Sequence, residues 1–133
     1  MNIHEFQGKN ILKSYGVAIQ EGIVASTPEE AKDAAAKLTE STGTSWYVIK
    51  AQIHAGGRGK GTVQETGSRG VVLAKSLDEV PQKAKDILNG TLVTIQTGEV
   101  GKKVNRALVA QDVYYPGDSE PEEYYMGVLL DRA

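Results

Sequence analysis

The chain has 133 residues, a formal net charge of −2 and no cysteine. This length suits one domain, and the lack of cysteine excludes disulfides and thiolate metal sites. The small net charge gives no support for binding to nucleic acid or to a membrane surface. No signal-like apolar run lies near Met1. We therefore expect a soluble, cytoplasmic domain.

Helices and strands alternate in the first part of the chain. The spacing of Asn2 and Glu5 is that of a capping box and predicts a short amphipathic helix that ends at Gly16. Residues 17–25 follow as a predicted strand. Thr27 then opens a second helix, because it is a good cap and precedes a proline at the first helical position.

The later part of the chain favours hairpins. The predicted elements are an apolar strand over residues 46–51, a strand over 70–74, a helix opened by Ser76, strands over 91–97 and 104–113 joined by a turn at 98–103, an acidic loop at 115–123 and a final strand over 124–133. Together these elements predict a mixed α/β (α+β) fold.

The segment best suited to an anionic ligand directly follows the apolar strand. Between Gly56 and Gly61 four residues are glycine, and the other two are Arg58 and Lys60. Glycine lets the backbone approach a ligand closely, and both cations suit phosphate oxygens. Lys50 lies near the end of the strand. We interpret this region as a polyphosphate site, although it matches neither the Walker pattern nor the dinucleotide-binding fingerprint. A mobile connection is the alternative interpretation.

Other catalytic constellations are missing from the sequence. With only His4 and His54, a histidine metal site is not expected, and we expect His54 to pack in the loop and His4 to lie at the surface. No serine has a histidine and an acid in a recognised local arrangement. This composition fits phosphoryl transfer by positioning and charge neutralisation. It equally fits a non-catalytic anion-binding or scaffold module.

Four blocks of the chain resemble the β subunits of succinyl-CoA synthetase (succinate–CoA ligase). They are residues 1–9, 48–60, 92–97 and 127–132, which occur in the order of that family. The His-Ala-Gly-Gly-Arg-Gly-Lys run in the second block is the most specific of these matches. The resemblance implies that residues 1–133 are the N-terminal part of an ATP-grasp domain with a mixed sheet and flanking helices. It also implies that the chain continues into the rest of that domain and a CoA-ligase domain.

The resemblance implies an acid–thiol ligase reaction in the citric acid cycle. Such a β subunit pairs with an α subunit that binds CoA and carries a phosphorylated histidine. The complex couples ATP or GTP to the formation of succinyl-CoA from succinate and CoA. Mg²⁺ would be bound by residues downstream of Ala133, so we expect the 133 residues alone to be inactive. A related acid–CoA ligase, such as malate–CoA ligase, remains an alternative.

The resemblance also assigns cofactor-binding positions, but no catalytic residue and no metal ligand. The implied positions are Lys50 at the nucleotide, Gly57, Arg58 and Gly59 over its phosphates, Ala110 at the adenine hinge and Glu123 near the sugar. Many relatives have glutamate where Ala110 stands, and the connection through residues 114–117 is longer here. The preference for ATP or GTP therefore stays open.

Overall fold

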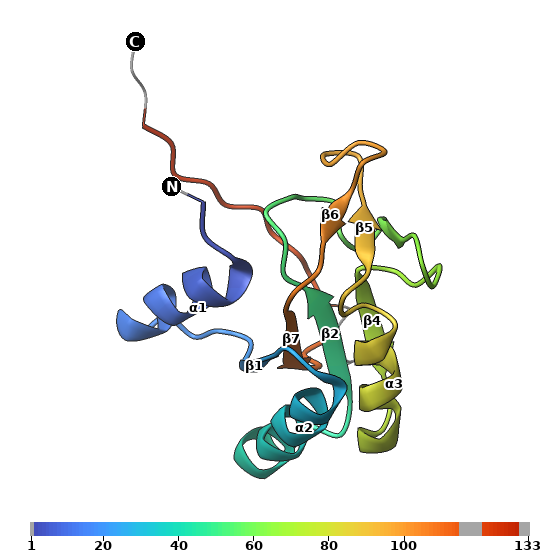
Figure 1. Cartoon of the computed structure of the whole chain (residues 1–133). Coiled ribbons are helices and arrows are strands. Elements are labelled where there is room, and N and C mark those ends of the chain that lie inside the picture. Colours follow the sequence, from blue (N-terminus) through green and yellow to red (C-terminus); the bar gives the residue numbers. More distant parts are fainter. Residues whose placement is uncertain (1, 115–120, 131–133) are drawn as a thin grey trace.

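A computed structural model describes residues 2–114 and 121–130 (Figure 1). The helices are α1 (Glu5–Ser14), α2 (Pro28–Thr42), the 3₁₀ helix η1 (Leu77–Glu79) and α3 (Val80–Lys85). The strands are β1 (Gly22–Ala25), β2 (Tyr47–Ala51), β3 (Thr62–Val63), β4 (Val71–Ala74), β5 (Thr91–Val93), β6 (Lys102–Lys103) and β7 (Ala107–Gln111). These elements confirm the predicted α/β fold class.

The strands form two sheets, with the order β1-β7-β2-β4 in one and β3-β5-β6 in the other. Every pairing among the described strands is antiparallel, where we expected a mixed sheet. The connection through α2 does leave β1 and β2 parallel, since both run antiparallel to β7. However, β7 lies between them and pairs with both. The sequence predicts the alternation of strand, helix and strand, but it does not predict that β7 lies between β1 and β2.

Helix α2 covers one face of the larger sheet. Its N-cap is Thr27, whose Oγ1 accepts a hydrogen bond from the Glu30 backbone N–H at 3.1 Å, as the sequence predicts. The side chains that α2 buries are Ala31, Ala34, Ala35 and Leu38. Because three of them are alanines, the helix approaches β1 and β7 closely. This layer, with Tyr47 and Ile49 of β2, forms the core.

Helix α1 lies against the sheet without a buried residue of its own. It begins at Glu5 with His4 as N-cap, two residues later than the predicted Asn2 cap, and the Gln7 side chain accepts from the His4 N–H at 2.8 Å. Most of the expected apolar face is exposed, with Ile11 at 51% and Leu12 at 49%, and only Phe6 is half-buried. Polar contacts therefore attach much of this helix to the rest of the domain.

Several predicted strands are shorter or are not formed. Of the strand predicted over residues 17–25, only residues 22–25 form a strand. Residues 94–97 form a turn where a strand was predicted, and the Thr97 N–H donates to the Thr94 carbonyl at 3.2 Å. Residues 124–130 are not strand, and Tyr125 is 99% exposed. Apolar residues make a strand only where another strand pairs with them, and no described strand pairs with this segment. Residues 115–120, most of the predicted acidic loop, and residues 131–133 lie outside the described residues.

Among the described residues, the helices are too short or too polar for any of them to cross a bilayer.

Candidate functional site

Lys50 occupies the sheet face that α2 does not cover. Alternation along β2 places Tyr47, Ile49 and Ala51 in the core, so Lys50 projects to the other side, where α1 lies. Its side chain is only 19% exposed. The Nζ atom donates to Gln20 Oε1 at 2.8 Å and to Glu5 Oε1 at 3.2 Å. The lysine head is thus held in place rather than free in water.

Arg58 reaches the same place from the glycine-rich loop. Its Nη1 donates to the Ala51 carbonyl at 2.7 Å, and its Nη2 donates to Glu5 Oε2 at 2.9 Å. The loop folds back on itself, since the N–H groups of Lys60 and Gly61 donate to the Gly57 carbonyl at 3.1 and 2.9 Å. The predicted loop cation and the predicted strand lysine are therefore brought together.

The loop glycines have different physical roles. Gly57 has a φ of 75°, in the left-handed region that favours glycine. A Cβ at Gly61 would lie 2.7 Å from the Val93 carbonyl, so this glycine is required by packing on the smaller sheet. A Cβ at Gly59 would meet nothing within 4 Å. Gly59 therefore lies on the open side of the loop, where a ligand could approach its backbone.

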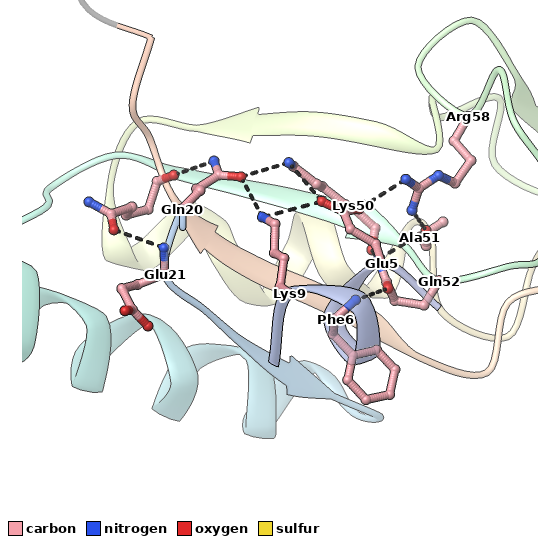
Figure 2. A network of polar contacts seen from close by, with 10 residues as sticks. Glu5, Phe6, Lys9, Gln20, Glu21, Lys50, Ala51, Gln52 and Arg58 are labelled. Carbon is pink, nitrogen blue, oxygen red and sulfur yellow. Dashed lines mark hydrogen bonds and ion pairs between the residues drawn. The ribbon is translucent and has the colours of Figure 1, made fainter. Parts of the chain in front are cut away.

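Glu5 joins the two predicted cations, and sequence analysis missed it (Figure 2). Lys9, one helical turn along α1, also approaches Glu5 Oε1 at 3.3 Å. The sequence places Glu5 in a cap and shows its i,i+4 spacing from Lys9. Nothing in the sequence shows that Lys50 and Arg58, 45 and 53 residues away, share its carboxylate.

The cluster of Glu5, Lys9, Lys50 and Arg58 is rich in positive charge. Burial opposes the ionisation of Glu5, but the combined effect of Lys50, Arg58 and Lys9 is larger and lowers its pKa to about 2. The pKa of Lys9 is lowered by burial and by repulsion from Lys50, against the attraction of Glu5. One carboxylate thus faces three cations, which leaves the cluster able to accept a further anion.

A cleft of about 470 Å³ borders the cluster and provides space for a ligand. Its lining residues are Asn2, Ile3, Glu5, Ile53, His54, Ala55, Gly56, Arg58 and Gln96. The Gly56 N–H in its wall donates to Gln96 Oε1 at 2.6 Å, so the start of the loop is tied to the turn after β5. A second cleft of about 460 Å³, between Trp46 and Tyr114, contains none of the four cluster residues. Of these two clefts, the one beside Arg58 is therefore the one that borders the charged cluster.

The remaining predicted residues are not part of the cluster. Ala110 is fully buried in β7, opposite Val48, which places it on the same sheet face as Lys50 but two positions away in register. Glu123 is exposed, and among the residues that the structure describes it has no hydrogen-bonding or ion-pair partner. The structure therefore brings together Lys50 and the loop, but neither Ala110 nor Glu123.

The two histidines stack on each other, with ring centroids 4.0 Å apart. His54 is exposed and is not packed within the loop as predicted, and His4 is half-buried rather than at the open surface. Burial, and then the positive charge of His54, Arg106 and Arg58, lowers the pKa of His4. The described part of the chain contains no group of three possible metal-ligating His, Cys, Asp or Glu side chains.

Comparisons with known proteins identify the family of the chain. The family model of the ATP-grasp domain matches residues 2–133. The β subunit of succinate–CoA ligase (ADP-forming) from Christiangramia forsetii is 62% identical over 133 residues, which are 100% of this chain and 32% of that protein. The same-named subunits of Flavobacterium psychrophilum and Chlorobium limicola are 58% and 51% identical to this chain. Each match includes 100% of this chain and corresponds to 32% and 31% of the length of the two relatives. The resemblance inferred from the four sequence blocks is confirmed. The chain spans 32% of the length of the first relative.

Proposed function

Because this chain belongs to the ATP-grasp family, we propose that Lys50 and Arg58 bind the phosphates of a nucleoside triphosphate at the end of β2. The observation that carries this proposal is their convergence on one carboxylate from two separate segments. Guanidinium and ammonium groups held this way suit phosphate oxygens as well as carboxylate oxygens. A mobile linker would not hold its one arginine against the strand at 2.7 Å from the Ala51 carbonyl.

The proposal extends to the glycines and to two residues outside the cluster. Gly57 and Gly59 would present loop N–H groups to the phosphates, supported by the positive φ of Gly57 and the open space beside Gly59. Ala110 is assigned to the base and Glu123 to the sugar. For these two residues the support is the resemblance to the family and not their surroundings.

The whole protein is proposed to be the β subunit of a succinate–CoA ligase, which pairs with an α subunit in the cytoplasm. The support is the printed name of relatives that are 51–62% identical over the whole chain. ATP or GTP would supply a phosphoryl group for the joining of succinate to CoA. The residues described here would position the nucleotide and neutralise its charge. The family implies Mg²⁺, but the described residues do not fit a magnesium site, because no group of acidic side chains gathers there.

Nucleotide affinity tests the phosphate assignment. In the purified protein, Lys50→Ala and Arg58→Ala should each weaken ATP binding about ten- to a hundredfold, since each removes a charge-assisted hydrogen bond worth about 1.5–3 kcal/mol. Isothermal titration calorimetry measures this affinity. Lys32→Ala is the control, because Lys32 is half-exposed and pairs only loosely with Asp78 at 3.9 Å.

The control should leave ATP affinity unchanged. Equal ATP affinity in the wild type and in both cluster variants would remove the phosphate assignment. It would favour the non-catalytic scaffold module instead.

A further inference from the structure

We propose that Glu5 is an internal counter-ion that occupies the position of an incoming phosphate group, so that nucleotide binding displaces its carboxylate from Lys50 and Arg58. This inference rests on the proposed function, because it concerns how the same cations receive the nucleotide. It assigns to helix α1 a role that neither the family match nor the names of the relatives describe. Figure 2 shows the carboxylate between the two cations.

Both oxygens of Glu5 accept from the groups assigned to the phosphates. Oε1 accepts from Lys50 at 3.2 Å and lies 3.3 Å from Lys9, and Oε2 accepts from Arg58 at 2.9 Å. Carboxylate and phosphate oxygens compete for the same guanidinium and ammonium donors, in similar geometry. The carboxylate therefore stands where a phosphate oxygen would bind.

The charges favour exchange rather than simultaneous binding. The side chains of Glu5, Lys50 and Arg58 are about one-fifth exposed, at 20%, 19% and 22%, so solvent screens them only partly. A triphosphate would repel a carboxylate held against the same cations. It carries more negative charge than Glu5, and it would therefore be the stronger partner for the three cations.

The cations keep other anchors when Glu5 leaves. Gln20 Oε1 accepts from both Lys50 and Lys9, at 2.8 and 2.9 Å, and Gln20 Nε2 donates to the Gln111 carbonyl at 2.7 Å. The Ala51 carbonyl holds Arg58 independently of the carboxylate. Displacement of Glu5 therefore leaves Lys50, Lys9 and Arg58 in place. If the carboxylate were their sole support, its displacement would release them.

The attachment of α1 would change when the carboxylate is displaced. This helix buries no residue. Its remaining contacts include the hydrogen bond from Lys9 to Gln20 at 2.9 Å, a 3.3 Å hydrogen bond from the Phe6 N–H to Gln52, and the exposed Lys13–Glu21 pair. Without the Glu5 contacts, α1 should open locally more often, because few buried contacts hold it. Nucleotide binding would thus loosen the start of the chain.

The isosteric variant Glu5→Gln tests the exchange. It keeps the side-chain shape and a carbonyl acceptor but removes the competing charge. Calorimetry with ATP, tripolyphosphate and adenosine should show about tenfold tighter binding of ATP and tripolyphosphate to the variant, equivalent to about 1.4 kcal/mol. Adenosine affinity should not change. Glu21→Gln is the matched control, because Glu21 forms the other ion pair of α1, with Lys13 at 2.7 Å, outside the cluster.

A second measurement concerns the wild type alone, so it does not depend on how the variant folds. Saturating tripolyphosphate should speed amide hydrogen exchange in α1, and leave exchange in α2 unchanged. Exchange in α1 that stays equal or slows would overturn the displacement.

The inference and the proposed function fail in different ways. Unchanged or weaker ATP binding by Glu5→Gln, together with weaker binding by Lys50→Ala, would overturn the counter-ion role and leave the phosphate site standing. Equal ATP binding by the wild type, Lys50→Ala and Arg58→Ala would overturn both.

Discussion

Helices α1 and α2 are associated with opposite faces of one sheet, and they are held in opposite ways (Figure 1). Helix α2 buries a stripe of alanines and Leu38 in the core, whereas α1 has no fully buried residue and is attached through the ions around Glu5. Breaking an apolar contact exposes its surface to water, at a cost in free energy. An ionic contact can be exchanged for another ion. The α2 face therefore provides stability, and the α1 face is suited to a charged ligand.

The largest expected effect on stability lies on the α2 face. Leu38→Ala should lower the free energy of unfolding by about 2–5 kcal/mol, because Leu38 is 2% exposed and its removal leaves a cavity. Chemical denaturation measures the loss. A change below about 1 kcal/mol would show that α2 can close the space, and it would weaken the contrast between the two helices.

The next largest effect should come from Glu5 and should depend on pH. The pKa of Glu5 is lowered from 4.5 to about 2 in the folded state. Its contribution to the free energy of unfolding is therefore complete above pH 4.5 and is lost as the pH falls through 2. The wild type should exceed Glu5→Gln in unfolding free energy by up to about 3 kcal/mol at pH 7. Below pH 2 the two should approach the same unfolding free energy.

Denaturation of both proteins at several pH values checks this dependence. A stability difference between wild type and Glu5→Gln that stays constant from pH 7 to pH 2 would contradict an ionic attachment of α1.

A smaller effect is expected at the start of α2. Thr27→Ala should cost about 1 kcal/mol, because the Glu30 N–H loses the hydroxyl that caps it at 3.1 Å. Thr27→Ser, which keeps the hydroxyl, should recover most of this loss. If both variants unfold at the wild-type midpoint, the cap does not contribute to the α2 attachment.

The smallest effect is expected on the α1 face. Ile11→Ala should change the free energy of unfolding by no more than about 0.5 kcal/mol, because the side chain is 51% exposed. The same denaturation series measures it. A loss similar to that of Leu38→Ala would mean that α1 is held by apolar packing, and the comparison between the two helices would be wrong.

Local signals made parts of this protein predictable from sequence. The cap at Thr27 and the following proline specify the start of α2, since these residues act on backbone groups within one turn. Lys50 and Arg58 were predicted as phosphate-binding residues because the apolar strand, the glycines and the cationic residues lie close together in the chain. Their convergence could be expected from that nearness.

Contacts between distant segments were not predictable in this way. Whether residues 124–130 form a strand depends on a partner that the described chain does not contain, so an apolar pattern was insufficient there. The strand order was not predictable, because β7, more than 50 positions after β2, enters between β1 and β2, which run parallel to each other.

The sequence by itself therefore determined the α/β class, the α2 helix and a cationic loop beside a strand lysine, because these depend on neighbouring residues. Only the tertiary structure decided the strand order, the sheet face on which Lys50 lies and the partner of its charge. The sequence pattern around Glu5 indicates only the start of a helix. In the folded chain Glu5 lies between Lys50 and Arg58 and accepts hydrogen bonds from both. The physical reason is that a charge acts on whatever lies within a few ångströms, and only folding brings residues 5, 50 and 58 to that distance.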